Sequence, residues 1–161
     1  MSAKFSIFSL VLFVVLITAT LQTYSQIFNG RLIVVNNVGD SYDTTPGDGN
    51  CGDIKGHCTL RAAIMESNAT APDDVIVFDI PDPSVITLKL GELPVSTRVV
   101  IMGRGARRLT IERDGSPNVG TFRIFNVTGG AHLRGMTIRN GHGAVGGGYF
   151  QRAALGLRML Y

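Results

Sequence analysis

Short apolar runs separated by turn residues make up most of the chain after residue 73. Runs rich in Val, Ile, Leu and Phe fall at 75–78, 85–88, 99–102, 109–111, 122–127 and 136–138, with a similar run at 32–35. Glycine, proline, Asp and Asn stand between them, as in Pro81-Asp82-Pro83 and Gly129-Gly130. This pattern predicts short β-strands joined by tight turns. Their spacing of about 10–13 residues also fits a sandwich or a barrel.

A degenerate repeat favours a coil of parallel strands over those two alternatives. The segments VVIMGRGARRLTIERDG and HLRGMTIRNGHG each place a strand-like run, a glycine and then a Thr-Ile pair. A period of roughly 20–30 residues is typical of solenoids. Two-residue hairpin signals are missing between the runs, apart from Asn140-Gly141. The sequence therefore predicts an all-β coil of parallel strands.

One segment, Thr59 to Ala69, has a helical pattern. Thr59 can cap the helix through its hydroxyl, and Leu60, Ala63 and Ile64 form an i, i+3, i+4 apolar stripe. Asn68, before Ala-Thr-Ala-Pro, is a plausible stop. A helix this short is not stable alone, so we expect it to cover the end of a sheet.

The N-terminal residues 1–25 are typical of a signal peptide. Lys4 gives a positive start, an apolar run spans Ile7 to Leu21, and Thr23 and Ser25 suit cleavage before Gln26. An uncleaved anchor is the alternative, because about 17 apolar residues from Phe5 reach the lower limit for a membrane span. We expect a secreted or cell-surface protein with no membrane span in the mature chain.

Composition and charge add a division into two halves. The 161 residues suit one domain, with 20 Gly and no Trp. Ten of the 12 acids lie in residues 36–92, whereas residues 93–161 hold ten Arg. The basic half predicts an anionic polysaccharide or a cell-surface component as partner, with Arg104, Arg107 and Arg108 as candidate glycan-binding residues. Nucleic acid is not expected, since no Tyr or Trp is interleaved with the Arg residues.

The acidic, Gly-rich loop contains Cys51 and Cys58, the only cysteines. In an exported protein such a pair predicts a disulfide, which would contribute roughly 2–3 kcal/mol. Zinc bound by these cysteines and His57 is an alternative, although the C-x6-C spacing lacks the usual knuckle. Calcium is another alternative, because hard oxygen ligands crowd this loop, but their register fails the EF-hand pattern. Those ligands are Asp40, Asp43, Asp48, Asn50 and Asp53. No cofactor is predicted, and calcium binding by the four aspartates stays open.

The segment GDGNCGDIKGHCTLRAAIMESNA resembles the CSLREA-type N-terminal module of exported bacterial proteins. The match lies in Cys51, in Cys58-Thr59-Leu60-Arg61-Ala62-Ala63-Ile64 and in Asn68-Ala69, and it extends from about Arg31 to Gly148. The resemblance implies a right-handed parallel β-helix of the pectin-lyase-like kind, with the helix as its N-terminal cap. It implies an architecture more firmly than an activity.

The resemblance and the patterns together divide the chain into four parts. These are a signal peptide (1–25), a disulfide-stapled cap (26–72), β-helix rungs (73–148) and an atypical tail (149–161). The tail YFQRAALGLRMLY lacks the alternation and the turn glycines of the preceding rungs, so we interpret it as non-native, from a frame shift or a truncated gene. Members of the family usually continue for many more rungs.

Catalysis is not expected from these residues. Glu112 and Asp114 are the only acids after residue 92, and His57, His132 and His142 are widely spaced with no nucleophile motif. The sequence favours an N-terminal, capped fragment of an exported β-helix protein with a structural, adhesin-like role. The alternatives are a binding module for anionic glycans or a polysaccharide lyase or hydrolase fragment. The oligomeric state stays open.

Overall fold

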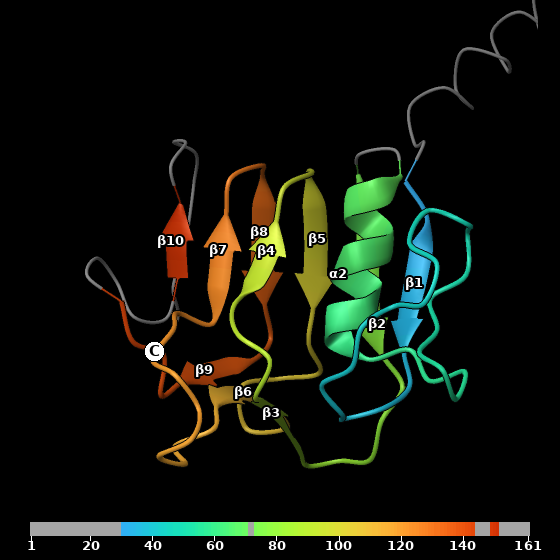
Figure 1. Ribbon diagram of the computed structural model, residues 1–161. Coiled ribbons are helices and arrows are strands. Elements are labelled where there is room, and N and C mark those ends of the chain that lie inside the picture. The colour runs from blue at the N-terminus through green and yellow to red at the C-terminus, as the bar shows by residue number, and fades with distance from the viewer. Residues whose placement is uncertain (1–29, 71–72, 144–148, 152–161) are drawn as a thin grey trace, which may run out of the picture.

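The computed structural model describes residues 30–70, 73–143 and 149–151 (Figure 1). These residues form one helix and ten short strands. In chain order the elements are β1 (Leu32–Val35), α2 (Leu60–Ala69), β2 (Asp74–Phe78), β3 (Ser84–Leu88), β4 (Leu93–Val95), β5 (Val99–Met102), β6 (Leu109–Arg113), β7 (Phe125–Val127), β8 (Ala131–Arg134), β9 (Thr137–Arg139) and β10 (Tyr149–Gln151). The fold is therefore mainly β, as predicted.

The strands assemble into three sheets, and every strand pair in them is parallel. Sheet A has the order β1-β2-β5-β8, sheet B the order β3-β6-β9, and sheet C the order β4-β7-β10. The chain visits A, B and C in the same sequence three times, through β2-β3-β4, β5-β6-β7 and β8-β9-β10 (Figure 1). We call each such set of three strands a coil. Parallel pairing excludes hairpin connections between these strands.

The predicted repeat is confirmed in the strand register. Met102 on β5 pairs with Arg134 on β8, so Gly103 and Gly135 follow at equivalent places in two successive coils. A Cβ atom on Gly103 would lie 2.1 Å from the Gly135 carbonyl oxygen, and Gly135 itself has a φ of +67°. Only glycine permits this approach of two turns. The Thr-Ile pairs of the two segments are also adjacent, in β6 and β9.

The core lies between the three sheets, because alternate residues of each strand point inward. In β2, for example, Ile76 is fully buried while Val75 and Val77 are half-buried. The strands contribute mainly Val, Ile and Leu, and β7 adds the fully buried Phe125. At the far end of the core, Leu133, Met136 and Ile138 are only partly buried.

Most of the predicted elements are confirmed, and three strands were missed: β4, β8 and β10, the last of which lies in the segment interpreted as an atypical tail. β4 escaped prediction because it is three residues long and contains Pro94. Its Leu93 N–H donates to the Ile124 carbonyl at 2.8 Å. The Pro94 nitrogen faces the other edge of β4, away from β7, so its missing N–H removes no hydrogen bond between the two strands. β8 was missed because His132 and Arg134 occupy its outward positions.

The helix α2 begins and ends close to its predicted limits. The Thr59 hydroxyl accepts a hydrogen bond from Ala62 N at 3.1 Å, as expected of an N-cap. The helix packs against β4, β1 and β2, and Figure 1 shows it in front of β2. The expectation that it covers the end of a sheet is confirmed, because α2 lies against β4, which is an edge strand of sheet C.

Two expectations concern segments at the ends of the chain. The signal peptide (1–25) lies outside the described residues. Within the tail, Tyr149–Gln151 forms β10 and pairs with β7, and residues 152–161 lie outside the described part. The interpretation of residues 149–161 as a non-native tail stays a prediction.

Candidate functional site

The segment 36–70, which we call the cap segment, consists of a long loop followed by α2. Cys51 and Cys58 form a disulfide with a Cα–Cα distance of 5.1 Å, so the predicted pairing is confirmed. Bonded to each other, the two sulfurs are not thiolate ligands for zinc. The third proposed zinc ligand, His57, lies with its Nδ1 3.7 Å from Asp53 Oδ2.

A buried ion pair holds the cap segment on the turn between β3 and β4. Arg61 Nε lies 2.6 Å from Asp40 Oδ1, and each side chain is only 4% exposed. Arg61 also donates to the carbonyls of Gly91, at 2.7 Å, and Glu92, at 3.0 Å. Asp40 Oδ2 in turn accepts from the backbone N–H groups that follow β3, those of residues 89 and 90, at 2.6 and 2.8 Å. The pair therefore satisfies four backbone groups that no other strand covers.

A second buried acid fixes the Gly-rich loop to the helix. Glu66 is 1% exposed and accepts from Gly47 N at 2.5 Å and from Gly49 N at 2.9 Å. Arg31 balances its charge, with Nη1 3.0 Å from Glu66 Oε1. The Arg31 backbone N–H donates to Asp74 Oδ1 at 2.7 Å, which ties the start of β1 to β2. Glu66 thus acts as a turn acceptor inside the cap segment.

Asn68 covers the free edge of β4 in the manner of a neighbouring strand. Its Nδ2 donates to the Pro94 carbonyl at 2.7 Å, and its Oδ1 accepts from Ser96 N at 2.9 Å. A single amide side chain therefore replaces one donor and one acceptor of a missing strand. An edge strand left with unpaired groups is a site for pairing with other chains, so this contact closes the first edge of sheet C.

The loop aspartates serve turns rather than a shared ion. The His57 backbone N–H, with the Ser41 hydroxyl, lowers the pKa of Asp53 to about 2. The Thr45 hydroxyl and the Asn50 N–H lower the pKa of Asp48. Asp43 accepts from Thr45 N through Oδ1, and its buried Oδ2 has no hydrogen-bond partner. Throughout the described residues, no three His, Cys, Asp or Glu side chains are placed to hold a metal ion.

The three candidate glycan-binding arginines lie together in the connection between β5 and β6. Arg108 Nη1 lies 3.3 Å from Asp82 Oδ2, and Arg104 Nη2 lies 4.0 Å from the same oxygen. Arg104 also donates to the Ile80 carbonyl at 2.5 Å. Arg107 is exposed, and among the described residues it makes no ion pair or hydrogen bond. Arg104 and Arg108 thus share one carboxylate at this turn, and Arg107 precedes Arg108 in the same connection.

The two acids considered as hydrolase residues form ion pairs with two different basic side chains. Glu112 Oε2 lies 2.6 Å from Arg139 Nε, and Asp114 Oδ2 lies 3.7 Å from Lys89 Nζ. The Ser116 hydroxyl and N–H lower the pKa of Asp114. A carboxyl group with a lowered pKa is ionised at neutral pH and is a poor general acid.

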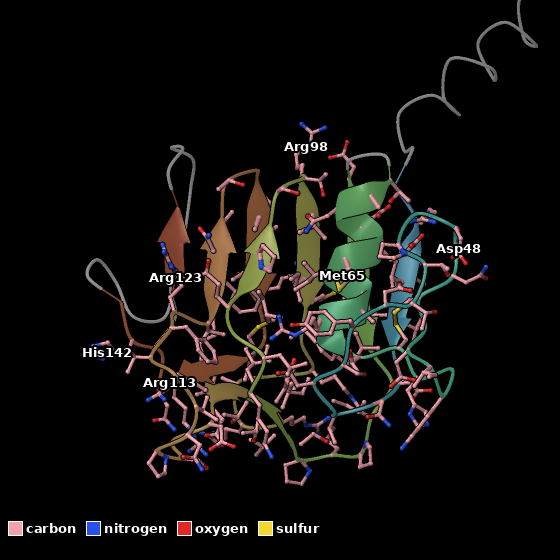
Figure 2. All side chains as sticks on the ribbon, viewed as in Figure 1. Asp48, Met65, Arg98, Arg113, Arg123 and His142 are labelled. Atoms are coloured by element: carbon pink, nitrogen blue, oxygen red, sulfur yellow. A yellow bond between two sulfur atoms is a disulfide. The ribbon has the colours of Figure 1, made fainter. Side chains whose placement is uncertain are left out.

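Acids from residues 36–92 pair with arginines from residues 93–161 in the described structure, as Asp73 does with Arg98 and Asp82 with Arg108. Figure 2 shows Asp48 on the loop beside β1, and Arg113, Arg123 and His142 toward the end that contains β7, β9 and β10. Arg123 Nε pairs with Glu92 Oε2 at 2.8 Å, so part of the basic end is neutralised. The acidic and basic halves of the sequence thus meet in ion pairs between successive coils.

In comparisons with known proteins, no model of a protein family, no curated protein and no solved structure matches the chain. The resemblance to the CSLREA-type module therefore stays a prediction. In the described ranges, no helix is long and apolar enough to cross a membrane.

Sequence reasoning missed the roles of Asp40, Arg61, Glu66 and Asn68. A usable signal existed for two of them, because Arg61 and Glu66 interrupt a helix whose neighbouring residues are almost all buried. Charged residues in such a helix require partners. The partners themselves lie 17 to 35 residues away, which local patterns do not reveal.

Proposed function

We propose that this chain forms the capped N-terminal part of a right-handed parallel β-helix in an exported or cell-surface protein. Its role is structural and adhesin-like: the cap segment starts the coil and blocks its first edge. The chain contributes no catalytic group in this proposal.

The order of the strands supports a β-helix. Three consecutive coils visit sheets A, B and C in one fixed sequence, with equivalent strands in parallel register. Connections between parallel strands of one sheet are right-handed in about 98% of proteins, which supports the proposed hand. The resemblance of the cysteine-containing segment to the CSLREA-type module points to the same architecture.

The contact of Asn68 with β4 is the observation that carries the structural role. A parallel coil has an open edge at its first turn, and such edges associate with other chains unless they are covered. Here α2 covers that edge, Asn68 supplies the two hydrogen bonds of a missing strand, and the Arg61–Asp40 pair covers the next turn. The disulfide fixes the loop that holds this arrangement.

The variant Asn68→Ala tests this role against Asn118→Ala, which removes an exposed asparagine from a loop. We expect Asn68→Ala to lower the free energy of unfolding by about 1–2 kcal/mol. We also expect concentration-dependent association, measured by light scattering, whereas Asn118→Ala should behave like the parent chain. Equal stability and equal scattering of the two variants would remove the basis for an edge-blocking role. Export is tested separately, by fusing residues 1–25 to a reporter and measuring its passage across the bacterial inner membrane.

A second candidate function is the binding of anionic glycans. It is favoured by the turn that carries Arg104, Arg107 and Arg108, where Arg104 and Arg108 share the single carboxylate of Asp82. Retention on a heparin column should fall for Arg107→Ala, which leaves the two arginines that contact Asp82 in place. Arg98→Ala is the matched control, since Arg98 pairs with Asp73 at a different turn. No retention of the parent chain at low salt would rule out this function.

A further inference from the structure

The outward face of sheet A is apolar over three of its four strands. The register places outward residues in two rows across the sheet: Leu32, Val75, Val100 and His132 in one, and Val34, Val77, Met102 and Arg134 in the other. Leu32 is 66% exposed and Val34 41% exposed. In a sheet with one face in water, these positions are normally polar. Six apolar side chains in adjacent positions therefore form a patch, which we call the sheet A face.

The fourth strand ends this patch with polar side chains and with the positive charge of Arg134. His132 and Arg134 occupy the outward positions of β8, and both are exposed. Arg134 Nη2 lies 3.2 Å from Met102 Sδ, and no described carboxylate pairs with Arg134. At the opposite end, beside β1, lies the acidic loop of the cap segment, on which Figure 2 shows Asp48. The face thus has an apolar centre between a basic end and an acidic end.

From this arrangement we propose that the sheet A face binds a second copy of the chain. In the dimer the order of the strands is reversed across the interface, so that β1 faces β8 of the second copy and β2 faces β5. A two-fold axis parallel to the strands produces this contact, in which the same patch is used twice. Val75 and Val77 then meet Val100 and Met102 of the second copy.

The charges select this arrangement over the other two-fold contact. If each strand faced its own counterpart, the two β8 strands would meet, and the like charges of the two Arg134 side chains would repel. In the reversed order, Arg134 of the second copy lies over Val34, at the end that carries the acidic loop. The basic end of each copy thereby approaches the acidic end of the other.

The size of the face predicts a weak dimer. Four strands about 4.8 Å apart, each rising about 3.3 Å per residue, give a face of roughly 300 Å² per copy. The two copies together bury about 600 Å², which is below the standard size of a stable interface. We therefore expect a dissociation constant between about 10 μM and 1 mM.

Substitutions of Val34 test both the occupant and its orientation. In sedimentation equilibrium up to about 1 mM, the full chain should shift from monomer to dimer. Val34→Lys should weaken the dimer at least tenfold, because it meets Arg134 of the second copy. Val34→Asp should retain it, because the new carboxylate pairs with that guanidinium. Val85→Lys is the control, since Val85 is 45% exposed on the outward side of sheet B.

Three results would overturn the proposal. A chain that stays monomeric over the whole range would remove the second copy as occupant. Association that Val34→Lys leaves unchanged, or that Val85→Lys weakens equally, would place the interface elsewhere. Loss of the dimer in both Val34→Asp and Val34→Lys would refute the reversed order of strands. Circular dichroism of each variant confirms that the sheets have formed, and Val34 is exposed enough to tolerate either charge.

Discussion

Replacing Arg61 by alanine should weaken the whole domain, because Arg61 connects the cap segment to the first coil. The guanidinium makes two bonds to Asp40, at 2.6 and 3.3 Å, and two to backbone carbonyls after β3. Its removal leaves Asp40, whose side chain is 4% exposed, as an unbalanced buried charge. Removing one partner of a buried pair typically costs about 3–5 kcal/mol. That is a large part of the total stability of about 5–15 kcal/mol expected for a domain.

Urea unfolding followed by circular dichroism measures this loss. With a slope of about 2 kcal/mol per molar urea, the midpoint should fall by about 1.5–2.5 M. Arg107→Ala is the matched control, because Arg107 is exposed and should change stability by less than about 0.5 kcal/mol. The double variant with Asp40→Ala should lose less than the sum of the two single variants, with a coupling of about 1–3 kcal/mol.

The reasoning would be refuted if the urea midpoint of Arg61→Ala differed from that of the parent chain as little as the midpoint of Arg107→Ala does. Strict additivity in the double variant would show that Arg61 and Asp40 act independently. In either case the cap segment would be held by its apolar contacts, through Leu60, Ala63 and Ile64, rather than by the ion pair.

Three further predictions concern the disulfide, the pH dependence and a turn. Replacing Cys51 and Cys58 by serine should lower the free energy of unfolding by about 2.5 kcal/mol in urea titrations, as loop-closure entropy for a seven-residue separation implies. The lowered pKa of Asp53 means that its stabilisation is complete above its ordinary value of 3.8 and is lost as pH falls to about 2. Melting temperatures should therefore drop over that window, and less steeply in Asp53→Asn; equal slopes would exclude the carboxylate as a cause. Gly135→Ala should cost at least about 1–3 kcal/mol because of its positive φ and its contact with the next turn, whereas Gly115→Ala, with open space around it, should be nearly neutral.

Local patterns predicted the elements that depend on neighbouring residues. The strands from Leu32 to Val35 and from Val99 to Met102 follow from apolar runs, and the helix start follows from the hydroxyl of Thr59. The spacing of a strand, a glycine and a Thr-Ile pair predicted the repeat, because turns stacked in successive coils meet the same steric limits. The disulfide followed from two cysteines in a chain that its N-terminal pattern predicts to be exported.

The candidate site depended on residues far apart in the chain. Asp40 bonds to residues 49 and 50 positions later, and Asn68 bonds to β4, whose short Pro-containing sequence did not read as a strand. Neither contact follows from periodicity, since both require the register of one coil on the next. The loop acids illustrate the same limit, because composition left calcium as an open alternative and did not reveal that Asp43, Asp48 and Asp53 each accept from a backbone N–H of the loop.

By itself, the sequence determined short strands, a capped helix, a disulfide and a division of charge, because each depends on residue type or on near neighbours. Tertiary structure decided that three sheets share one core, that Asn68 and the Arg61–Asp40 pair cover the first edge, and that an apolar face is left outward on sheet A. The physical reason is that these features arise from parallel register between coils about 25 to 32 residues apart. That register is set by packing of the whole stack rather than by any single segment.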